Sequence, residues 1–298
     1  MVLALEECDM NSMTLTNEQA LLDQVSCVRQ IDPRVFELLR HEALTVPAED
    51  TWVTEYSQFQ SGGWWTLSLL NKSGDPADVK ISDCDPVETT LLREMPMTRK
   101  FLTELGLRYM WARIARLGSN SFLWEHRDYD ELDRSERYRL HIPLTSNSSA
   151  ALVTGGAQIH LAPGRIWQLT PTHVHGACNL LGPDRYHLLL DCYADDRLTE
   201  LVSGAWLNDS EVSELPRATR AELETRYDRA QALAKLGFVQ SAEKYLLRLF
   251  YERAVPEGLA YDMIASLHDL LEHCDVAERW RANKEVLLGL SHRKERSA

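Results

Sequence analysis

A polar stretch in the middle of the chain, residues 124–133 with the sequence WEHRDYDELD, combines side chains that can do chemistry. Its core, His-Arg-Asp, also opens the catalytic loop of protein kinases, where an Asn five residues after the Asp holds a magnesium ion. Here that position is Asp133, and the chain has no Gly-rich phosphate loop, no Val-Ala-Ile-Lys-type strand and no Asp-Phe-Gly. We therefore exclude a kinase and consider His126 and Asp128 as metal ligands.

His126 and Asp128 are two residues apart, so on an extended segment their side chains share a face and can converge on one ion. A third ligand has to come from a distant segment, and the spacing leaves both His173 and His175 as candidates. Two imidazoles and one carboxylate on one face of an octahedron leave three positions open, which is typical of non-haem Fe(II) oxygenases. The alternative is a solvated surface loop of mixed charge, EHRDYDELDRSER.

Arg185 begins a strand-like run, RYHLLLDC, ten residues after His175. Strand alternation places one set of its side chains on a common face: Arg185, His187, Leu189 and Asp191. An arginine that points into a β core needs an anionic partner. That partner is either a structural carboxylate or, next to an open metal site, a dicarboxylate cosubstrate that the guanidinium can bind with two hydrogen bonds.

Strands have to position these residues. Between 108 and 194 short strand-like runs alternate with turn clusters such as GSN, SNSS and LGPD, which predicts an antiparallel sandwich or barrel. Residues 1–50 are expected to mix helix and loop, with a helical period in NEQALLDQVSCVRQ, and residues 86–106 to be helical. After about 205 four segments follow a 3.6-residue period, without a 34-residue repeat, so a helical region follows the β core.

Composition limits the function. A formal net charge of −13 disfavours binding to nucleic acid or to an anionic membrane. The six cysteines are scattered, the first ten residues lack the apolar core of a signal peptide, and no run of 18 apolar residues occurs. These features predict a cytoplasmic protein with reduced thiols.

The set His126-x-Asp128, His175 and Arg185 resembles the Fe(II)/2-oxoglutarate-dependent oxygenases, and within them the bacterial L-proline cis-hydroxylases and the wider aspartyl/asparaginyl β-hydroxylase group. The likeness extends to YSQFQSGGWWTLSLLNKSGD, HRDYDELDR, IHLAPGRIWQLTPTHVHGACN and DRYHLLLDC. It implies a mainly β core, a double-stranded β-helix (jelly-roll, cupin-like) with flanking helices over residues 1–204, followed by an α-helical C-terminal domain over 205–298.

The resemblance also implies roles for individual residues. Fe(II) would be held by His126, Asp128 and His175, with His173 a neighbour that spacing does not exclude. Arg185 would bind the distal carboxylate of 2-oxoglutarate, and His141 would contact the same cosubstrate, with O₂ as the oxidant. Arg139 and Arg113 would hold the carboxylate of an amino-acid substrate; the alternative for each is an ordinary salt bridge.

The expected function is therefore hydroxylation of a free L-amino acid, proline-like or related, coupled to conversion of 2-oxoglutarate to succinate and CO₂. Leu152 stands where the proline 3-hydroxylase pattern has a pocket histidine, which leaves a bulkier or more apolar amino acid, or a cyclic homologue, equally admissible as the substrate. The alternatives are a hydroxylase of a peptide- or carrier-bound residue, and a non-catalytic or zinc-holding β-barrel module. A homodimer is left open.

Overall fold

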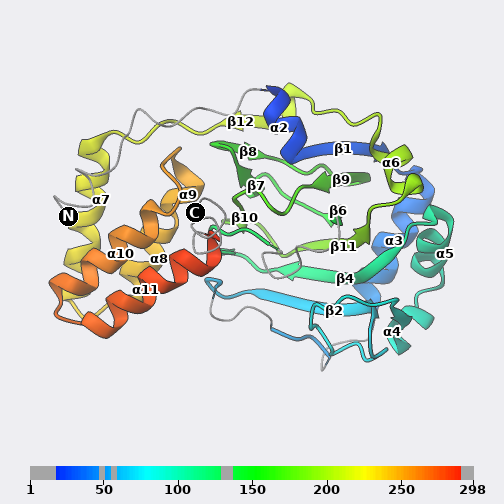
Figure 1. Ribbon diagram of the computed structural model, residues 1–298, viewed down its shortest axis with the longest axis horizontal. Helices are drawn as coiled ribbons and strands as arrows, with labels where there is room; N and C mark the ends of the chain where they lie inside the picture. Colours follow the sequence, from blue (N-terminus) through cyan, green and yellow to red (C-terminus); the bar gives the residue numbers. More distant parts are fainter. Residues whose placement is uncertain (1–17, 47–50, 55–58, 129–136, 290–298) are drawn as a thin grey trace, which may run out of the picture.

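Two antiparallel β-sheets form the centre of the protein, in a computed structural model that describes residues 18–46, 51–54, 59–128 and 137–289 (Figure 1). The larger sheet has the strand order β1-β9-β6-β11-β4-β2-β3, and the smaller sheet has the order β12-β8-β7-β10-β5. Eight consecutive strands make up the core of both sheets: β4 (Tyr109–Leu117), β5 (Ser121–Phe122), β6 (Arg137–Thr145), β7 (Ala150–Thr154), β8 (Ala157–Ile159), β9 (Arg165–Leu169), β10 (His175–Asn179) and β11 (Arg185–Tyr193).

These eight strands are wound as a double-stranded β-helix. Strands β4, β6, β9 and β11 belong to the larger sheet, whereas β5, β7, β8 and β10 belong to the smaller one. The chain therefore passes repeatedly from one sheet to the other, as in a jelly roll. The predicted fold class is confirmed, and the inner faces of the two sheets enclose the space in which the candidate site lies.

Four further strands extend the sheets. β1 (Val25–Gln30), β2 (Trp64–Asn71) and β3 (Val87–Glu88) widen the larger sheet, and β12 (Val212–Glu214) pairs with β8 in the smaller one. The helical period predicted for residues 17–30 is wrong over its second half. The helix α2 (Glu18–Gln24) ends where β1 begins, because Val25 and its neighbours pair with β9 and bury four consecutive side chains.

Helices cover the outer face of the larger sheet: α3 (Pro33–Thr45), α4 (Thr90–Arg93), α5 (Pro96–Leu105) and α6 (Asp196–Val202). The start of α3 is set by local sequence, because the Asp32 carboxylate accepts hydrogen bonds from two backbone N–H groups and Pro33 fits the first turn. Apolar side chains of these helices pack on the outward residues of β11, including Leu188 and Leu190.

The last third of the chain is mainly helical, as predicted: α7 (Arg220–Lys235), α8 (Val239–Leu247), α9 (Leu249–Glu252), α10 (Leu259–Leu270) and α11 (Cys274–Leu287), after a short 3₁₀ turn at Asp209–Glu211. The strand β12, which pairs with β8, is the exception to that prediction. A capping box between Thr219 and Glu222 starts α7. These helices share one apolar cluster with outward residues of the smaller sheet, among them Phe122 and Val153. No helix in the described residues is long and apolar enough to cross a bilayer.

Candidate active site

Three side chains that can bind a metal meet at the mouth of the double-stranded β-helix: His126, Asp128 and His175. One ligand atom from each lies within 4.8 Å of the others. The Asp128 carboxylate is 3.8 Å from Nε2 of His126 and 3.7 Å from Nε2 of His175. Backbone hydrogen bonds in both directions between His126 and His175, at 3.0 and 2.9 Å, bring the two segments together.

Both imidazoles are oriented with Nε2 toward the carboxylate. Nδ1 of His126 lies 2.6 Å from the carbonyl of Trp124, and Nδ1 of His175 lies 2.8 Å from the carbonyl of His173. A proton on each Nδ1 donates to that carbonyl and leaves Nε2 free to bind an ion. Burial, together with the neighbouring His126, lowers the pKa of His175 to about 3, so its ring is neutral at pH 7, the form that a metal requires.

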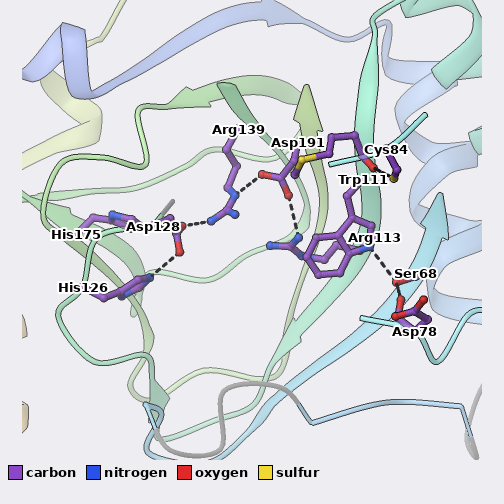
Figure 2. A network of polar contacts seen from close by, with 11 residues as sticks. Ser68, Asp78, Cys84, Trp111, Arg113, His126, Asp128, Arg139, His175 and Asp191 are labelled. Carbon is purple, nitrogen blue, oxygen red and sulfur yellow. Dashed lines mark hydrogen bonds and ion pairs between the residues drawn. The ribbon is translucent and has the colours of Figure 1, made fainter. Parts of the chain in front are cut away.

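Asp128 is linked to a chain of buried charges (Figure 2). Its carboxylate forms an ion pair with Nη1 of Arg139, whose Nε donates to Asp191 at 2.8 Å. The other oxygen of Asp191 accepts from Nη1 of Arg113 at 2.8 Å. Burial alone would raise the pKa of Asp128, but Arg139 and the two imidazoles outweigh it and hold the pKa well below its usual range. Asp128 therefore remains ionised.

Arg113, the last residue in this series of ion pairs, is held in place by an aromatic ring. The Arg113 guanidinium lies 3.7 Å from the centre of the Trp111 ring, an arrangement that stabilises a buried cation. The indole N–H of Trp111 donates to Ser68 Oγ at 2.9 Å, and that hydroxyl donates to the carbonyl of Asp78 at 2.7 Å (Figure 2). Strands β2, β4 and β11 thus hold Arg113 from several sides.

The cluster opens into a cavity of about 270 Å³ between the two sheets. Its wall contains the three cluster residues and the remaining polar residues predicted from the sequence, namely Arg113, Arg139, His141 and Arg185. The apolar lining includes Trp64, Leu152, Leu169, Leu189 and, from α11, Val286 and Leu287. The structure therefore brings all seven predicted site residues to one cavity.

Arg185 is the cation in this cavity that lacks a carboxylate partner among the described residues. Its side chain is 3% exposed, its Nε has no hydrogen-bond partner there, and burial lowers its pKa to about 10. The alternation predicted for β11 is confirmed, because Leu189 lines the cavity and Asp191 reaches Arg113 and Arg139 on the same side.

His141 is on β6, opposite Leu189 of β11, and its imidazole faces the cavity. Its Nδ1 is 3.4 Å from Nδ1 of His187, and its buried Nε2 has no partner within the described part of the chain. Burial, and then the charges of Arg139 and Arg185, lower the pKa of His141 well below its usual value. A neutral imidazole with an unused Nε2 can donate to, or accept from, a bound polar molecule.

The tryptophans near the two sheets differ in their relation to the cavity. Trp64 lines the cavity, whereas Trp167 is fully buried in the apolar cluster that also contains the wall residues Leu152 and Leu169. Trp65 lies beneath the Arg116 guanidinium, and Trp124 packs against Trp280 of the C-terminal helices.

Two features of the site were missed from the sequence. Asp191, on the predicted inward face, received no role although it forms ion pairs with both Arg113 and Arg139. Val286 and Leu287 were not connected with the site, because nothing local in a helix reveals that its end reaches a cavity more than 100 residues away in the sequence. The strand period was a sufficient signal for Asp191.

Comparisons with known proteins point to one family. Residues 34–195, more than half of the chain, match the family described as Aspartyl/Asparaginyl beta-hydroxylase. An L-proline cis-3-hydroxylase 2 from Streptomyces sp is 31% identical over 153 residues, 49% of this chain and 52% of that protein. An L-proline cis-4-hydroxylase from Rhizobium meliloti (strain 1021) is 32% identical over 146 residues, 46% and 50% of the two chains. The chain thus spans about half the length of these curated relatives.

Solved structures show a more distant likeness. A Pseudomonas putida prolyl-4-hydroxylase is 11% identical, with a TM-score of 0.38 over 65% of this chain and all of that one. A 2OG-Fe(II) oxygenase family protein from Burkholderia pseudomallei is 17% identical, with a TM-score of 0.35 over 52% of this chain and 76% of that one. On the family match, this chain belongs to the aspartyl/asparaginyl beta-hydroxylase family, whose enzymes are Fe(II)- and 2-oxoglutarate-dependent dioxygenases, and its His126, Asp128 and His175 fit the iron.

Proposed function

We propose that this protein hydroxylates a free L-amino acid, proline or a related one, and couples the reaction to conversion of 2-oxoglutarate to succinate and CO₂. The observation that carries the proposal is the combination, in one cavity, of a His/Asp/His cluster with a buried arginine that has no carboxylate partner among the described residues. A zinc-holding or non-catalytic module would have no use for Arg185, whose burial without an anion costs free energy. A bound dicarboxylate removes that cost.

Each polar residue then has a role. His126, Asp128 and His175 would hold Fe(II), which supplies the activation of dioxygen. Arg185 would bind the distal carboxylate of 2-oxoglutarate through two parallel hydrogen bonds, and Nε2 of His141 would make a further contact with the same molecule. The protein orients both small molecules and excludes water from the reacting carbon.

For the substrate, we propose that its carboxylate is bound at the Arg113 and Arg139 side of the cavity. Both guanidiniums already share the single charge of Asp191, and Arg139 also contacts Asp128, so they are held in place before a substrate arrives. The named relatives are hydroxylases of L-proline, which supports a small amino acid. Leu152 in the cavity wall favours an apolar ring or side chain there.

A panel of free L-amino acids tests the proposal. The protein is incubated with Fe(II), 2-oxoglutarate, ascorbate and each amino acid, and products are analysed by mass spectrometry for a gain of one oxygen atom derived from ¹⁸O₂. We expect one small cyclic or apolar amino acid to be hydroxylated with stoichiometric formation of succinate. If only peptide- or carrier-bound residues were hydroxylated, the proposal of a free amino-acid substrate would be wrong. If no substrate led to succinate, the proposed 2-oxoglutarate-dependent activity would be wrong.

Arg185→Gln tests the cosubstrate site. Loss of a charge-assisted pair in a buried site costs roughly 2–5 kcal/mol, so the apparent KM for 2-oxoglutarate should rise about thirtyfold or more. Arg116→Gln, on the neighbouring strand and paired with the partly exposed Asp184, is the matched control and should leave this KM unchanged. An unchanged KM in Arg185→Gln would show that the cosubstrate is bound elsewhere.

A further inference from the structure

Arg127, the central residue of the His-Arg-Asp motif, has no role in the function described so far. Its side chain is 9% exposed and makes contacts to three separate parts of the chain. Nη1 donates to the carbonyl of Thr172 at 2.8 Å, Nη2 pairs with both carboxylate oxygens of Glu257 at 3.0 and 2.8 Å, and Nε donates to the carbonyl of Leu288 at 3.2 Å.

These partners connect the metal cluster with the C-terminal helices. Thr172 lies three residues before His175, Glu257 lies just before α10, and Leu288 caps the end of α11. The backbone N–H of Arg127 also donates to the carbonyl of Leu287 at 2.8 Å. One side chain, placed between two cluster residues, therefore joins both ligand-bearing segments to the helical region.

The residue on the other side of His126 is held by the same region. The Glu125 carboxylate is buried and accepts from the backbone N–H of Gly258 at 3.0 and 3.1 Å. The Tyr261 hydroxyl donates to the Glu125 carbonyl at 2.6 Å, and the Tyr251 hydroxyl donates to the carbonyl of Leu123. The backbone around His126 is thus fixed by α9, α10 and the turn between them.

We propose that Arg127 is a positioning residue that fastens the metal-bearing segment to the C-terminal helices, so that the helical region sets the geometry of the iron ligands. The proposal rests on the proposed function only in taking this cluster as the metal site. A planar guanidinium can bind a carboxylate and two carbonyls at fixed angles, and groups that orient metal ligands control affinity for the ion. The competing explanation is a surface ion pair, because the Glu257 side chain is 52% exposed.

Binding of Co(II) in place of Fe(II), followed by its visible absorption and by equilibrium dialysis, tests the proposal without any turnover. Arg127→Met keeps an unbranched side chain but removes the guanidinium and its hydrogen bonds, so we expect the Kd for Co(II) to rise about tenfold to a hundredfold, as for other residues that orient ligands. Arg127→Lys should fall between this variant and the wild type. Arg253→Met removes an arginine paired with Glu222 on the helical region and should leave the Kd unchanged.

Glu257→Gln removes the negative charge and one of the two acceptor oxygens on the helical side, and leaves the metal-bearing segment unchanged. Because its carboxylate is half exposed, we expect the variant to fold, with a two- to fivefold higher Kd for Co(II) and faster amide exchange at residues 172–175.

A folded Arg127→Met with the wild-type Kd and spectrum would overturn the proposal. Should Arg127→Met fail to fold, wild-type Kd and exchange in Glu257→Gln would overturn it instead. A wild-type protein without a Co(II) site would overturn it together with the metal assignment, whereas a wild-type protein that binds Co(II) without turnover would contradict only the proposed reaction.

Discussion

Asp191 connects Arg113 and Arg139, the two arginines that we propose bind the substrate carboxylate. The carboxylate is fully buried, and each of its oxygens accepts from a different guanidinium, Arg113 on β4 and Arg139 on β6. Two guanidiniums that contact the same carboxylate are close to each other and would repel without that anion between them. Asp191 thus keeps the two cations together on either side of β11 and fixes the direction in which Arg139 reaches Asp128.

Asp191→Asn should therefore destabilise the fold. The amide keeps the shape but removes the buried charge, and breaking a buried ion network typically costs about 3–5 kcal/mol. Urea unfolding followed by circular dichroism measures the change in free energy. Asp184→Asn is the control, since its pair with Arg116 is partly exposed and should contribute at most about 1 kcal/mol. If both variants lowered the free energy of unfolding equally, the Asp191 network would not stabilise the fold more than an exposed ion pair does.

His175 and His173 can be separated in the same way. His175 directs Nε2 toward Asp128, whereas His173 contacts the cluster through its backbone carbonyl. We expect His175→Ala to abolish succinate formation and Co(II) binding, and His173→Ala to retain both within about threefold, because the substitution preserves that carbonyl. If His173→Ala were inactive and His175→Ala active, His173 and not His175 would be the third metal ligand.

The sequence predicted the site residues to the extent that their geometry is local. His126 and Asp128 share a face at i and i+2, and the β11 alternation correctly placed Leu189 and Asp191. The pairing of Arg113 and Arg139 with Asp191 depends on the register of three strands that are far apart in the sequence. A residue pattern in one segment does not specify that register, so the arginines were assigned only by resemblance.

At the level of elements, β1 shows where periodicity fails. The apolar residues before and within Val25–Gln30 fit a helix over a short window, yet Val25 and Val28 are β-branched and their segment pairs with β9. A neighbouring strand supplies hydrogen bonds and burial that outweigh a weak local preference. The four helical segments predicted after residue 205 correspond to α7, to α8 together with α9, to α10 and to α11, because each segment carries a 3.6-residue apolar period.

The end of α11 contributes to the cavity wall, and Val286 offers a way to test its influence on the substrate. The side chain lines the cavity yet is 64% exposed, so Val286→Phe should change the free energy of unfolding by no more than about 0.5 kcal/mol. The larger ring narrows the cavity. We expect kcat/KM for a bulkier analogue of the accepted amino acid to fall about tenfold more than for that amino acid itself.

The control for this variant is Leu236→Phe, an exposed position at the end of α7 that does not line the cavity. It should alter neither stability nor the ratio of kcat/KM values. If Val286→Phe also leaves the ratio unchanged, α11 does not contribute to substrate selection.

At the scale of the whole molecule, the β core and the C-terminal helices are physically continuous. The division at residues 204 and 205 remains a prediction, but the structure pairs β12 with the smaller sheet and places the five helices beyond it in one apolar cluster with residues of that sheet. The family match ends at residue 195, so these helices lie outside the residues that match the family. Nothing in their sequence indicated which face of the β core they would cover, because an apolar stripe on a helix does not identify its partner.

A chain shortened to residues 1–204 should therefore not fold as a stable unit. The deletion exposes apolar side chains on the smaller sheet, among them Phe122, Val153 and Cys178, and it leaves the β8 edge without β12. It also removes Glu257 and Leu288, the partners of Arg127. We expect no cooperative thermal transition, strong binding of a hydrophobic dye and no Co(II) site, all measured against the full chain. A sharp transition with Co(II) bound would instead establish residues 1–204 as an independent domain, and would show that the helices do not hold the metal ligands in place.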